Sequence, residues 1–498
     1  MLTRRELLVR ATRAGGAATL WAGGCARVPR YESGGDGVWL NDIHSQLNRT
    51  RVLRVEQPLT VDALADVVRR AAREDRALSI AGGRHAMGGQ QFGADTVHVD
   101  VSGLDAILQF DASRGHVEVG AGIQWPALVS GLLERQRGQA RQWGIVQKQT
   151  GADRLSLGGA LAANAHGRGL TYAPIAQDVE AFTLVDVRGE VRRCSRSENA
   201  ELFALALGGY GLFGVIATVR LRLAPRRKIE RVVEVTGTEG LARRFDQRIG
   251  EGYLFGDFQY STDLDSETLL RQGVFSCYRP VADDTPMRDG QTELSRDNWL
   301  DLLHAGHLDR AEAYRRYSSY YLQTSGQIYW SDTHQLAEYI DDYHVALGTR
   351  LGPLASGTEM ITEIYVPRPA LANFLETVRA DLLEHSVNLI YGTIRLIEPD
   401  TDSFLAWARQ PWACVIFNLH TAHDPDALGR TAAHFRRLID RGREHGGSYF
   451  LTYHRWATRE QVLACYSQLP EFLALKRKYD PRERFQSEWY RHYRSMFA

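Results

Sequence analysis

The stretch Ser79-Ile80-Ala81-Gly82-Gly83-Arg84-His85-Ala86-Met87-Gly88-Gly89-Gln90 decides the fold class of this chain. It places four glycines within eight residues, directly after a predicted strand over 77–80. Glycine tolerates positive φ angles and lets the backbone come close to a ligand. Successive backbone N–H groups in such a loop form a concave nest for an anion. The stretch therefore predicts a loop that binds a pyrophosphate.

A second stretch, Ser156-Leu157-Gly158-Gly159-Ala160-Leu161-Ala162-Ala163-Asn164-Ala165-His166-Gly167-Arg168-Gly169, consists mostly of small residues. Small side chains permit the close approach of a flat ring. We therefore expect a second ligand-binding loop here. A structural role for the histidine of this stretch, His166, is the alternative.

The segment 209–214 spells G-x-G-x-x-G but does not qualify as a dinucleotide fingerprint. Such a fingerprint follows a strand, opens a helix, and has an acidic ribose partner further along the chain. Here the motif follows a predicted helix and opens a predicted strand, which is the reverse of the required order. The sequence therefore excludes a Rossmann loop at this position.

The elements around these loops predict an α+β unit that closes at Pro225. Thr60 is a suitable N-cap for a helix over 61–74, and helices are also predicted over 126–135 and 198–207. Predicted strands cover 52–55, 77–80, 97–101, 116–119, 178–187 and 215–223. From Arg226 onward aromatic residues are dense, and helical stretches alternate with strands near 363–366 and 415–419. We predict a ligand-binding domain over 46–225, a substrate (cap) domain over 226–445, and a C-terminal segment over 446–498 that returns to the first domain.

The bulk composition describes a globular protein of 498 residues with 44% hydrophobic and 24% charged residues. Lys plus Arg and Asp plus Glu both number 60, so the net charge is zero. A neutral chain lacks the basic footprint of a nucleic-acid binder and of a protein that adheres to anionic lipid. No apolar run is long enough to cross a bilayer.

The cysteines do not predict a metal site. None of them forms a C-x-x-C pair or accompanies a histidine cluster, so we assign no metal ligand. We expect scattered buried thiols, and a disulfide stays open if the compartment is oxidising. The five residues are Cys25, Cys194, Cys277, Cys414 and Cys465.

The N-terminus, Met1-Leu2-Thr3-Arg4-Arg5-Glu6-Leu7-Leu8, resembles a twin-arginine export signal. The signal would cover residues 1–30 and implies a periplasmic or secreted protein that is exported already folded. A basic amphipathic helix that begins the fold is the alternative. Ala22-Gly23-Gly24-Cys25 loosely resembles a lipoprotein cleavage box, which leaves a lipid anchor at Cys25 open.

The two glycine stretches resemble those of the FAD-linked oxidases of the vanillyl-alcohol oxidase superfamily, which share a two-domain PCMH-type FAD-binding fold. Arg84-His85-Ala86 occupies the place where many members carry a histidine bonded to the flavin 8α-methyl group, so covalent FAD through His85 is implied. By this resemblance, a turn near 214 leads into a strand that borders the adenosine. The implied cofactor residues are Ala81, Gly82, Gly83, Arg84, His85, Ala86, Gly88, Gly89, Gln90, Ser156, Gly158, Gly159, Asn164, His166, Gly214, Val215 and Ile216.

The later part of the chain is similar to the aldonolactone and alditol oxidase branch of that superfamily. Glu363-Ile364-Tyr365-Val366-Pro367-Arg368 resembles its E-x-x-[IV]-P-R strand, and Ile394-Arg395-Leu396-Ile397 looks like a neighbouring strand. The segment 473–481 is similar to its closing helix. The chain departs from the branch at Tyr453-His454-Arg455-Trp456, where no flavin-facing lysine stands. His454 or Arg455 would then take part of that role.

The resemblance implies an enzyme that transfers a hydride from a CH–OH group of a sugar, polyol or lactone to flavin N5. Glu363 is the candidate to accept a proton or bind a hydroxyl, Arg395 to hold an anionic substrate or stabilise reduced flavin, and His454 to assist. A surface or interdomain ion pair is the structural alternative for Glu363 and for Arg395. The partners implied are a small hydroxylated substrate and either oxygen or an electron carrier. Two other functions stay open: a reductase or epimerase-type oxidase acting on a lipid-linked sugar or sterol, and an exported binding lipoprotein without turnover.

Overall fold

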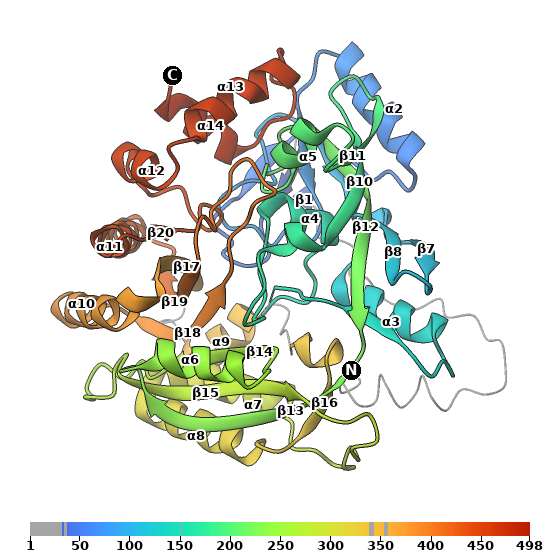
Figure 1. The fold of residues 1–498 in the computed structure, drawn as a ribbon. Helices are drawn as coiled ribbons and strands as arrows, with labels where there is room; N and C mark the ends of the chain where they lie inside the picture. The colour runs from blue at the N-terminus through green and yellow to red at the C-terminus, as the bar shows by residue number, and fades with distance from the viewer. Residues whose placement is uncertain (1–31, 34–36, 150, 338–342, 353–356) are drawn as a thin grey trace.

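The computed structural model describes residues 32–33, 37–149, 151–337, 343–352 and 357–498, which form two units (Figure 1). In the first unit, a parallel three-stranded sheet, β4-β6-β5, lies beside an antiparallel sheet of order β11-β10-β12-β8-β7, with β9 paired to β12. A third sheet joins β1, β2 and β3. The strands are β1 (Glu32–Ser33), β2 (Val38–Leu40), β3 (Thr50–Val52), β4 (Arg54–Glu56), β5 (Leu78–Ala81), β6 (Val97–Asp100), β7 (Ile107–Asp111), β8 (His116–Gly120), β9 (Trp143–Ile145), β10 (Val179–Val185), β11 (Val191–Ser195) and β12 (Val215–Pro225).

The helices of this unit follow from local signals in the sequence. The predicted helix after Thr60 is confirmed as α2 (Val61–Arg73), and the Thr60 hydroxyl accepts a hydrogen bond from the Ala63 amide at 3.1 Å. Leu64 and Val68 lie on its buried face. The other predicted helices are present as α3 (Trp125–Arg135) and α5 (Ala200–Ala206).

Two local predictions are wrong. The predicted strand 52–55 is divided at Leu53, because β3 pairs with β2 while β4 pairs with β6 in a different sheet. The predicted second loop contains a helix, α4 (Leu157–Ala163), whose N-cap Ser156 accepts from the Gly159 amide. Alanine and leucine at its buried positions favour the helix, which outweighs the glycines at its start.

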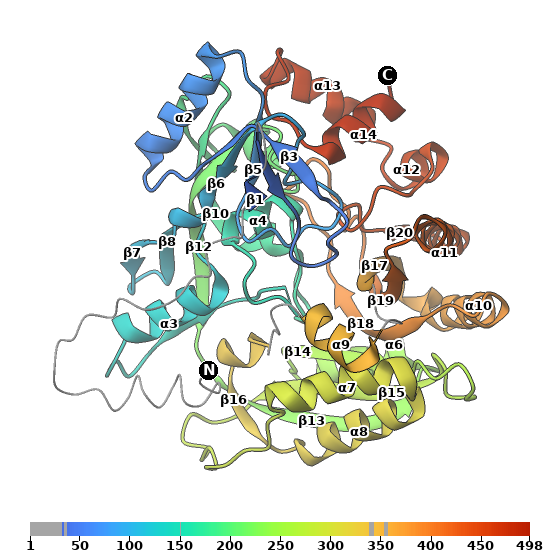
Figure 2. The ribbon, with the colours of Figure 1, turned by 180° about the vertical axis from the view of Figure 1, so that it is seen from behind.

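The second unit contains, among the described residues, an eight-stranded antiparallel sheet of order β16-β13-β15-β14-β18-β19-β17-β20. Its strands are β13 (Lys228–Gly237), β14 (Phe255–Tyr260), β15 (Gln272–Pro280), β16 (Ile328–Trp330), β17 (Gly357–Pro367), β18 (Leu389–Ile397), β19 (Trp412–Ala422) and β20 (Ser448–Tyr449). Its helices are α6 (Leu241–Gly250), α7 (Arg296–Leu308), α8 (Arg310–Gln323), α9 (Tyr343–Leu351), α10 (Leu371–Glu384) and α11 (Pro425–Glu444). Figure 2 shows α7, α8 and α9 gathered at the end of the unit far from α2.

Strand β17 presents two different faces. On one face Thr362 and Ile364 are fully buried, and a Cβ on Gly442 of α11 would lie 2.6 Å from Ile364 Cγ2, so α11 covers this side. The side chains of Glu359, Ile361 and Glu363 alternate with these and point to the opposite side. That opposite side faces the first unit.

The C-terminal segment packs back onto the first unit. After β20 the chain forms α12 (Arg459–Cys465), α13 (Leu469–Tyr479) and α14 (Glu488–Met496). Phe485 forms a parallel bridge with Leu78 of β5, just ahead of the first glycine loop. A buried ion pair between Lys476 and Asp480 ends α13, and Asp480 also accepts from the Phe485 amide at 2.8 Å. The closing helix therefore fixes the strand from which the glycine loop starts.

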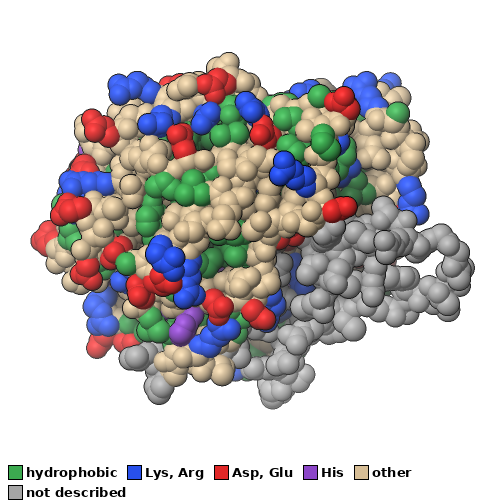
Figure 3. Space-filling model, turned by 90° about the horizontal axis from the view of Figure 1, so that it is seen from below, with side chains coloured by type: hydrophobic (Ala, Val, Ile, Leu, Met, Phe, Trp, Pro, Cys, Tyr) green, Lys and Arg blue, Asp and Glu red, His purple; other side chains and the backbone are tan. Residues whose placement is uncertain are grey.

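The surface and the cysteines match an ordinary globular chain. Figure 3 shows acidic and basic side chains interspersed on one face of the molecule. No helix within the described ranges has the length and apolarity needed to cross a membrane. Four cysteines of the described chain are buried and free, as predicted for scattered thiols, while Cys25 and the rest of the predicted export signal lie outside the described residues.

We expect Asp480→Asn to lower the free energy of unfolding by about 3–5 kcal/mol, because it leaves the buried Lys476 ammonium without its counter-charge. Urea denaturation followed by tryptophan fluorescence measures this change. The matched control is Lys478→Ala, which removes an exposed ion pair with Glu201 worth about 0–1 kcal/mol. Equal destabilisation by the two variants would contradict the anchoring role of the buried pair.

Candidate functional site

A cavity of about 350 Å³ lies between the two units, and both glycine stretches line it. The first unit lines the cavity with three segments. They are the first glycine loop (residues 80–87 with Gln90 and Gln91), residues of α4 and its flanks, and the turn 210–216 except Leu212. The sheet contributes Asp257, Gln259, Ile361, Glu363, Tyr391, Thr393, Arg395 and Ile416, and the C-terminal segment contributes Phe450, Thr452 and Tyr453.

The two glycine stretches pack directly against each other. A Cβ on Gly82 would lie 2.1 Å from Ser156 Oγ, and a Cβ on Gly83 would lie 2.4 Å from the Arg154 carbonyl oxygen. In the first loop the positive φ angles fall on Arg84, at 56°, and on Gly89, at 76°. Gly82 and Gly83 are therefore required for contact between the stretches, and the backbone can line the cavity from both sides.

His85 lines the cavity from the first loop. Burial lowers the pKa of its ring to about 3, and neighbouring cationic side chains, including Arg154 and Arg84, act in the same direction. The imidazole is therefore neutral at physiological pH. A neutral imidazole nitrogen carries a free electron pair and is a nucleophile.

The turn after α5 forms another wall of the cavity. Gly211 and Gly214 have φ angles of 74° and 145°, and Tyr210 has a φ of 52°. The turn leads straight into Val215 and Ile216 of β12, which also line the cavity. The arrangement is helix, turn, strand, in agreement with the rejection of a Rossmann loop here.

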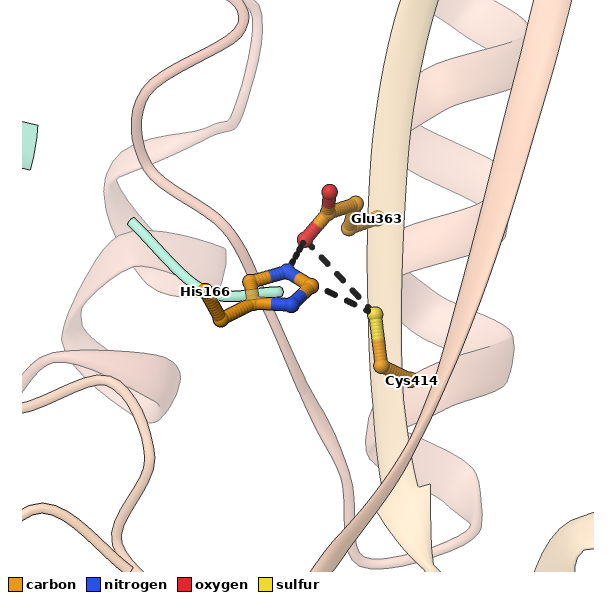
Figure 4. A group of neighbouring side chains, drawn as sticks. All are labelled: His166, Glu363 and Cys414. Atoms are coloured by element: carbon orange, nitrogen blue, oxygen red, sulfur yellow. Dashed lines mark hydrogen bonds and ion pairs between the residues drawn. The ribbon is translucent and has the colours of Figure 1, made fainter. Parts of the chain in front are cut away.

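Glu363 of β17 is the centre of the polar end of the cavity. Its Oε2 accepts from His166 Nε2 at 2.8 Å and from the Tyr365 hydroxyl at 2.8 Å, while its Oε1 accepts from the Tyr453 hydroxyl at 2.7 Å. Figure 4 shows the His166 ring directed at the Glu363 carboxylate, with Cys414 of β19 beside both. The His166–Glu363 pair joins the second glycine stretch to the sheet.

The partners of Glu363 fix its charge. Burial alone would raise its pKa, but the His166 ring, hydrogen bonds from His166 and Tyr453, and nearby Arg395 lower the pKa of this carboxyl to about 2. His166 Nδ1 lies 3.1 Å from the Gly167 carbonyl oxygen. Both ring nitrogens thus lie next to oxygen atoms, so the His166 ring is held between the Glu363 carboxylate and the Gly167 carbonyl. A carboxylate accepts about four hydrogen bonds, so Oε1, with one donor, keeps room for another.

Arg395 of β18 is a buried cation that faces the cavity. It is 9% exposed, and its Nε makes no hydrogen bond within the described residues. A buried guanidinium donor without an acceptor is costly unless a ligand supplies one. Tyr391 and Thr393 of the same strand add hydroxyl groups to this wall, so the site suits an oxygen-rich or anionic ligand.

Several predicted site residues do not reach the cavity. Asn164 is fully buried at the C-cap of α4, where its amide donates to Asp400 and its oxygen accepts from the Ala176 amide. His454 stacks near Phe435 and Trp456 and lies 3.3 Å from the Thr362 hydroxyl, on the opposite face of β17. Neither Asn164 nor His454 lines the cavity, and both have structural surroundings. Gly88 and Gly89 also lie behind the lining residues, with Gly88 packed against Gln90 and Thr452.

Tyr453, Tyr365 and Cys414 belong to the Glu363 site but are not predicted from the sequence. Tyr453 directly precedes His454, and adjacent side chains point to opposite sides of the chain, so only Tyr453 faces Glu363. Burial raises the pKa of the Cys414 thiol well above its usual value, so the thiol stays protonated beside Glu363. A protonated thiol is a poor metal ligand, and the His166–Glu363–Cys414 group is better described as a hydrogen-bonded cluster.

Comparison with known proteins identifies the first unit. Residues 52–195 match the family described as "FAD binding domain", so the chain contains an FAD-binding domain, as the glycine loops predict. The chain is 28% identical over 171 residues to L-gulonolactone oxidase of Bos taurus, covering 34% of this chain and 37% of that protein. It is 26% identical over 219 residues to L-gulono-1,4-lactone dehydrogenase of Mycobacterium tuberculosis, covering 44% and 49% respectively. Cytokinin dehydrogenase 4 of Oryza sativa subsp. japonica is 30% identical over 191 residues, covering 36% of this chain and 35% of that protein.

These matches span less than half the length of the relatives. The family match at residues 52–195 lies within the first unit. The mixed helix and sheet structure agrees with the predicted α+β class and its two-domain FAD-binding fold.

The described residues fit FAD. An added Cβ on Gly159 would meet only Ser156 Oγ, at 3.0 Å, so this cavity-lining position is open on its other sides. The unsatisfied Arg395 Nε offers a donor at the opposite end. FAD is thus the cofactor of this domain, with the first glycine loop, the α4 stretch and the 214–216 segment as the residues that would hold it.

We expect Gly83→Ala to weaken FAD binding by about tenfold or more, because its Cβ would press on the Arg154 carbonyl and force the two stretches apart. The flavin absorbance per mole of purified protein and a titration of apoprotein with FAD measure the loss. The matched control is Gly429→Ala in α11, where an added Cβ meets nothing within 4 Å. Full flavin content in Gly83→Ala would show that this contact is dispensable.

Proposed function

We propose that this protein is an FAD-dependent oxidoreductase that oxidises a CH–OH group of a small hydroxylated substrate of the sugar, polyol or lactone type. The observation that carries the proposal is the polar wall opposite the flavin loops, with ionised Glu363 and buried Arg395 facing one cavity. The L-gulonolactone oxidase and dehydrogenase names of the relatives favour this class over a reductase, an epimerase-type oxidase or a binding lipoprotein.

The chemistry divides between the cofactor and the chain. Bound FAD supplies the acceptor for the two electrons and the hydrogen that leave the carbinol carbon as hydride. The chain positions the hydroxyl and takes its proton: Glu363 Oε1 has room for one more hydrogen bond, and it remains charged because His166 and Tyr453 donate to the carboxylate. As the hydride leaves, the hydroxyl becomes strongly acidic, so even a carboxylate with a low pKa can accept its proton.

Arg395 would hold negative charge in the same site. Its free Nε can donate to a ligand oxygen that gains charge during the reaction, or to a carboxylate or lactone oxygen of the substrate. Oxygen or an electron carrier would then reoxidise the reduced cofactor, which closes the electron balance. Steady-state oxygen consumption distinguishes these two acceptors.

We expect anaerobic addition of a polyol, aldonolactone or sugar acid to bleach the flavin absorbance of the wild-type protein. Glu363→Gln should slow this bleaching about 10²- to 10³-fold, because it removes a charge aimed at the reacting group. Stopped-flow absorbance provides the rate, and flavin content shows that the site is still formed. The control is Glu376→Gln, an exposed carboxylate paired with Arg271. If no hydroxylated substrate bleaches the wild-type flavin, or if both variants are equally fast, the proposed function fails.

Covalent attachment of FAD through His85 is a second part of the proposal. It is supported by a neutral ring that lines the cavity beside the first glycine loop. The bond would form between an imidazole nitrogen of His85 and the carbon of the flavin 8α-methyl group. That methyl group would lose a proton, and its two electrons would reduce the flavin ring itself. Oxygen or the electron carrier would then restore the oxidised flavin.

Acid precipitation of wild-type protein should retain a yellow, fluorescent flavin on the polypeptide, while His85→Ala should release it. His44→Ala, which changes a histidine that also lines the cavity, serves as the control and should keep the flavin attached. Complete loss of flavin from fully loaded wild-type protein on acid treatment would exclude the covalent bond and leave the FAD site itself intact.

Export through a twin-arginine signal and a lipid anchor at Cys25 stay predictions from the sequence. Residues 1–31 lie outside the described residues. An exported flavoprotein that acquires FAD before export is consistent with the Arg4-Arg5 pair.

A further inference from the structure

A second cluster of functional side chains lies on the cavity-facing side of the sheet, beyond the substrate wall. Glu359 is two residues before the lining residue Ile361 on β17, and His420 stands directly opposite it on β19. His307, in the last turn of α7, completes the group. Three elements far apart in the sequence therefore place two imidazoles and one carboxylate together.

The distances in this cluster match a metal-binding geometry. His307 Nε2 lies 2.9 Å from Glu359 Oε1, and His420 Nδ1 lies 3.5 Å from the same oxygen. Ligand atoms at about 2.0–2.1 Å from a tetrahedral zinc ion lie about 3.3 Å apart. The two imidazole rings are 4.9 Å apart and nearly perpendicular, so both can direct a nitrogen to one point beside the carboxylate.

The charge of the cluster also favours a cation. The Glu359 side chain is 5% exposed, and those of His307 and His420 are 8% and 13% exposed. A buried carboxylate is costly unless positive charge compensates it. His420 Nδ1 is buried and makes no hydrogen bond within the described chain, so its electron pair is available when the ring is neutral.

We propose that His307, Glu359 and His420 bind a divalent transition metal, with zinc as the best match. Two histidines and one carboxylate are a ligand set of catalytic zinc sites, which keep a further position open for water or substrate. Structural zinc sites, by contrast, use four protein ligands. The three ligands come from two paired strands and a helix, a rigid scaffold that holds the atoms in place.

The position of this site suggests what the open coordination position serves. Ile361 and Tyr391, which line the cavity, are the next cavity-facing residues on β17 and β18 toward the polar end. Glu359 and its two histidine partners do not line the cavity themselves, and Ile361 lies between Glu359 and Glu363 on the same face of β17. A substrate that contacts Glu363 and extends past Ile361 would bring an oxygen distant from the reacting carbon toward the metal. This role rests on the proposed function, whereas the metal site itself does not.

Metal analysis of the purified flavin-loaded protein tests the site. After chelator treatment and dialysis, zinc added as its chloride should bind at one ion per chain in competition with a chromophoric chelator. Cobalt(II) should give the visible absorption of a four- or five-coordinate site. His420→Ala and Glu359→Ala should each weaken zinc binding by more than about 100-fold. Zinc should raise the melting temperature of the wild-type protein and leave that of these variants unchanged.

His304→Ala, one turn before His307 on α7, is the matched control and should bind zinc like the wild type. His307→Gln keeps a hydrogen-bond donor and should lose zinc while its flavin content stays normal, which separates metal binding from folding. If the wild-type protein binds no stoichiometric zinc, or if the ligand variants bind it as tightly, the cluster is only a hydrogen-bonded group and the proposal is overturned. Because the readout is metal content, this result is independent of any substrate turnover.

Discussion

The structure of this protein depends on a buried hydrogen bond between His166 and Glu363. The two side chains are only 4% and 3% exposed, and they come from different units of the chain. A buried carboxylate is tolerated only when its oxygens are hydrogen-bonded or paired, so separating the units would leave the Glu363 carboxylate without its partner from the first unit. The pair therefore fixes how the flavin-binding unit docks on the sheet, and the cavity is a consequence of that docking.

Strand β17 shows how one element serves both stability and chemistry. Thr362 and Ile364 are buried against the α11 side, while Glu359, Ile361 and Glu363 are directed to the cavity side. The period of two in a strand makes this division unavoidable. A shift of one residue in register would place the carboxylates under α11 and turn Thr362 and Ile364 toward the cavity. The pairing of β17 with β19 therefore determines the residues of the site as well as the stability of the sheet.

Particular residues show how far sequence reasoning reached. Thr60 and the first glycine loop act through neighbours a few residues away, and their predicted elements are present in the structure. The strands that carry Glu363 and Arg395 are predicted to face the substrate, and both residues line one cavity although β19 lies between the two strands. His454, which is predicted to assist, lies on the opposite face of β17, whereas its neighbour Tyr453 contacts Glu363. Adjacent residues of an extended chain point in opposite directions, and the sequence does not state which one faces the cavity. Asn164 is predicted to bind the cofactor but does not line the cavity, because its left-handed backbone directs the side-chain amide toward Asp400.

The sequence by itself determined the FAD-binding class, because that signal is local: glycines, a strand before them and small residues after them in one continuous stretch. Only the tertiary structure decided the charge state of Glu363, the free donor of Arg395 and the grouping of His307, Glu359 and His420. Each of these depends on atoms separated by dozens to hundreds of residues along the chain. Such contacts arise from packing, and packing leaves no periodic pattern in the sequence from which it could be predicted.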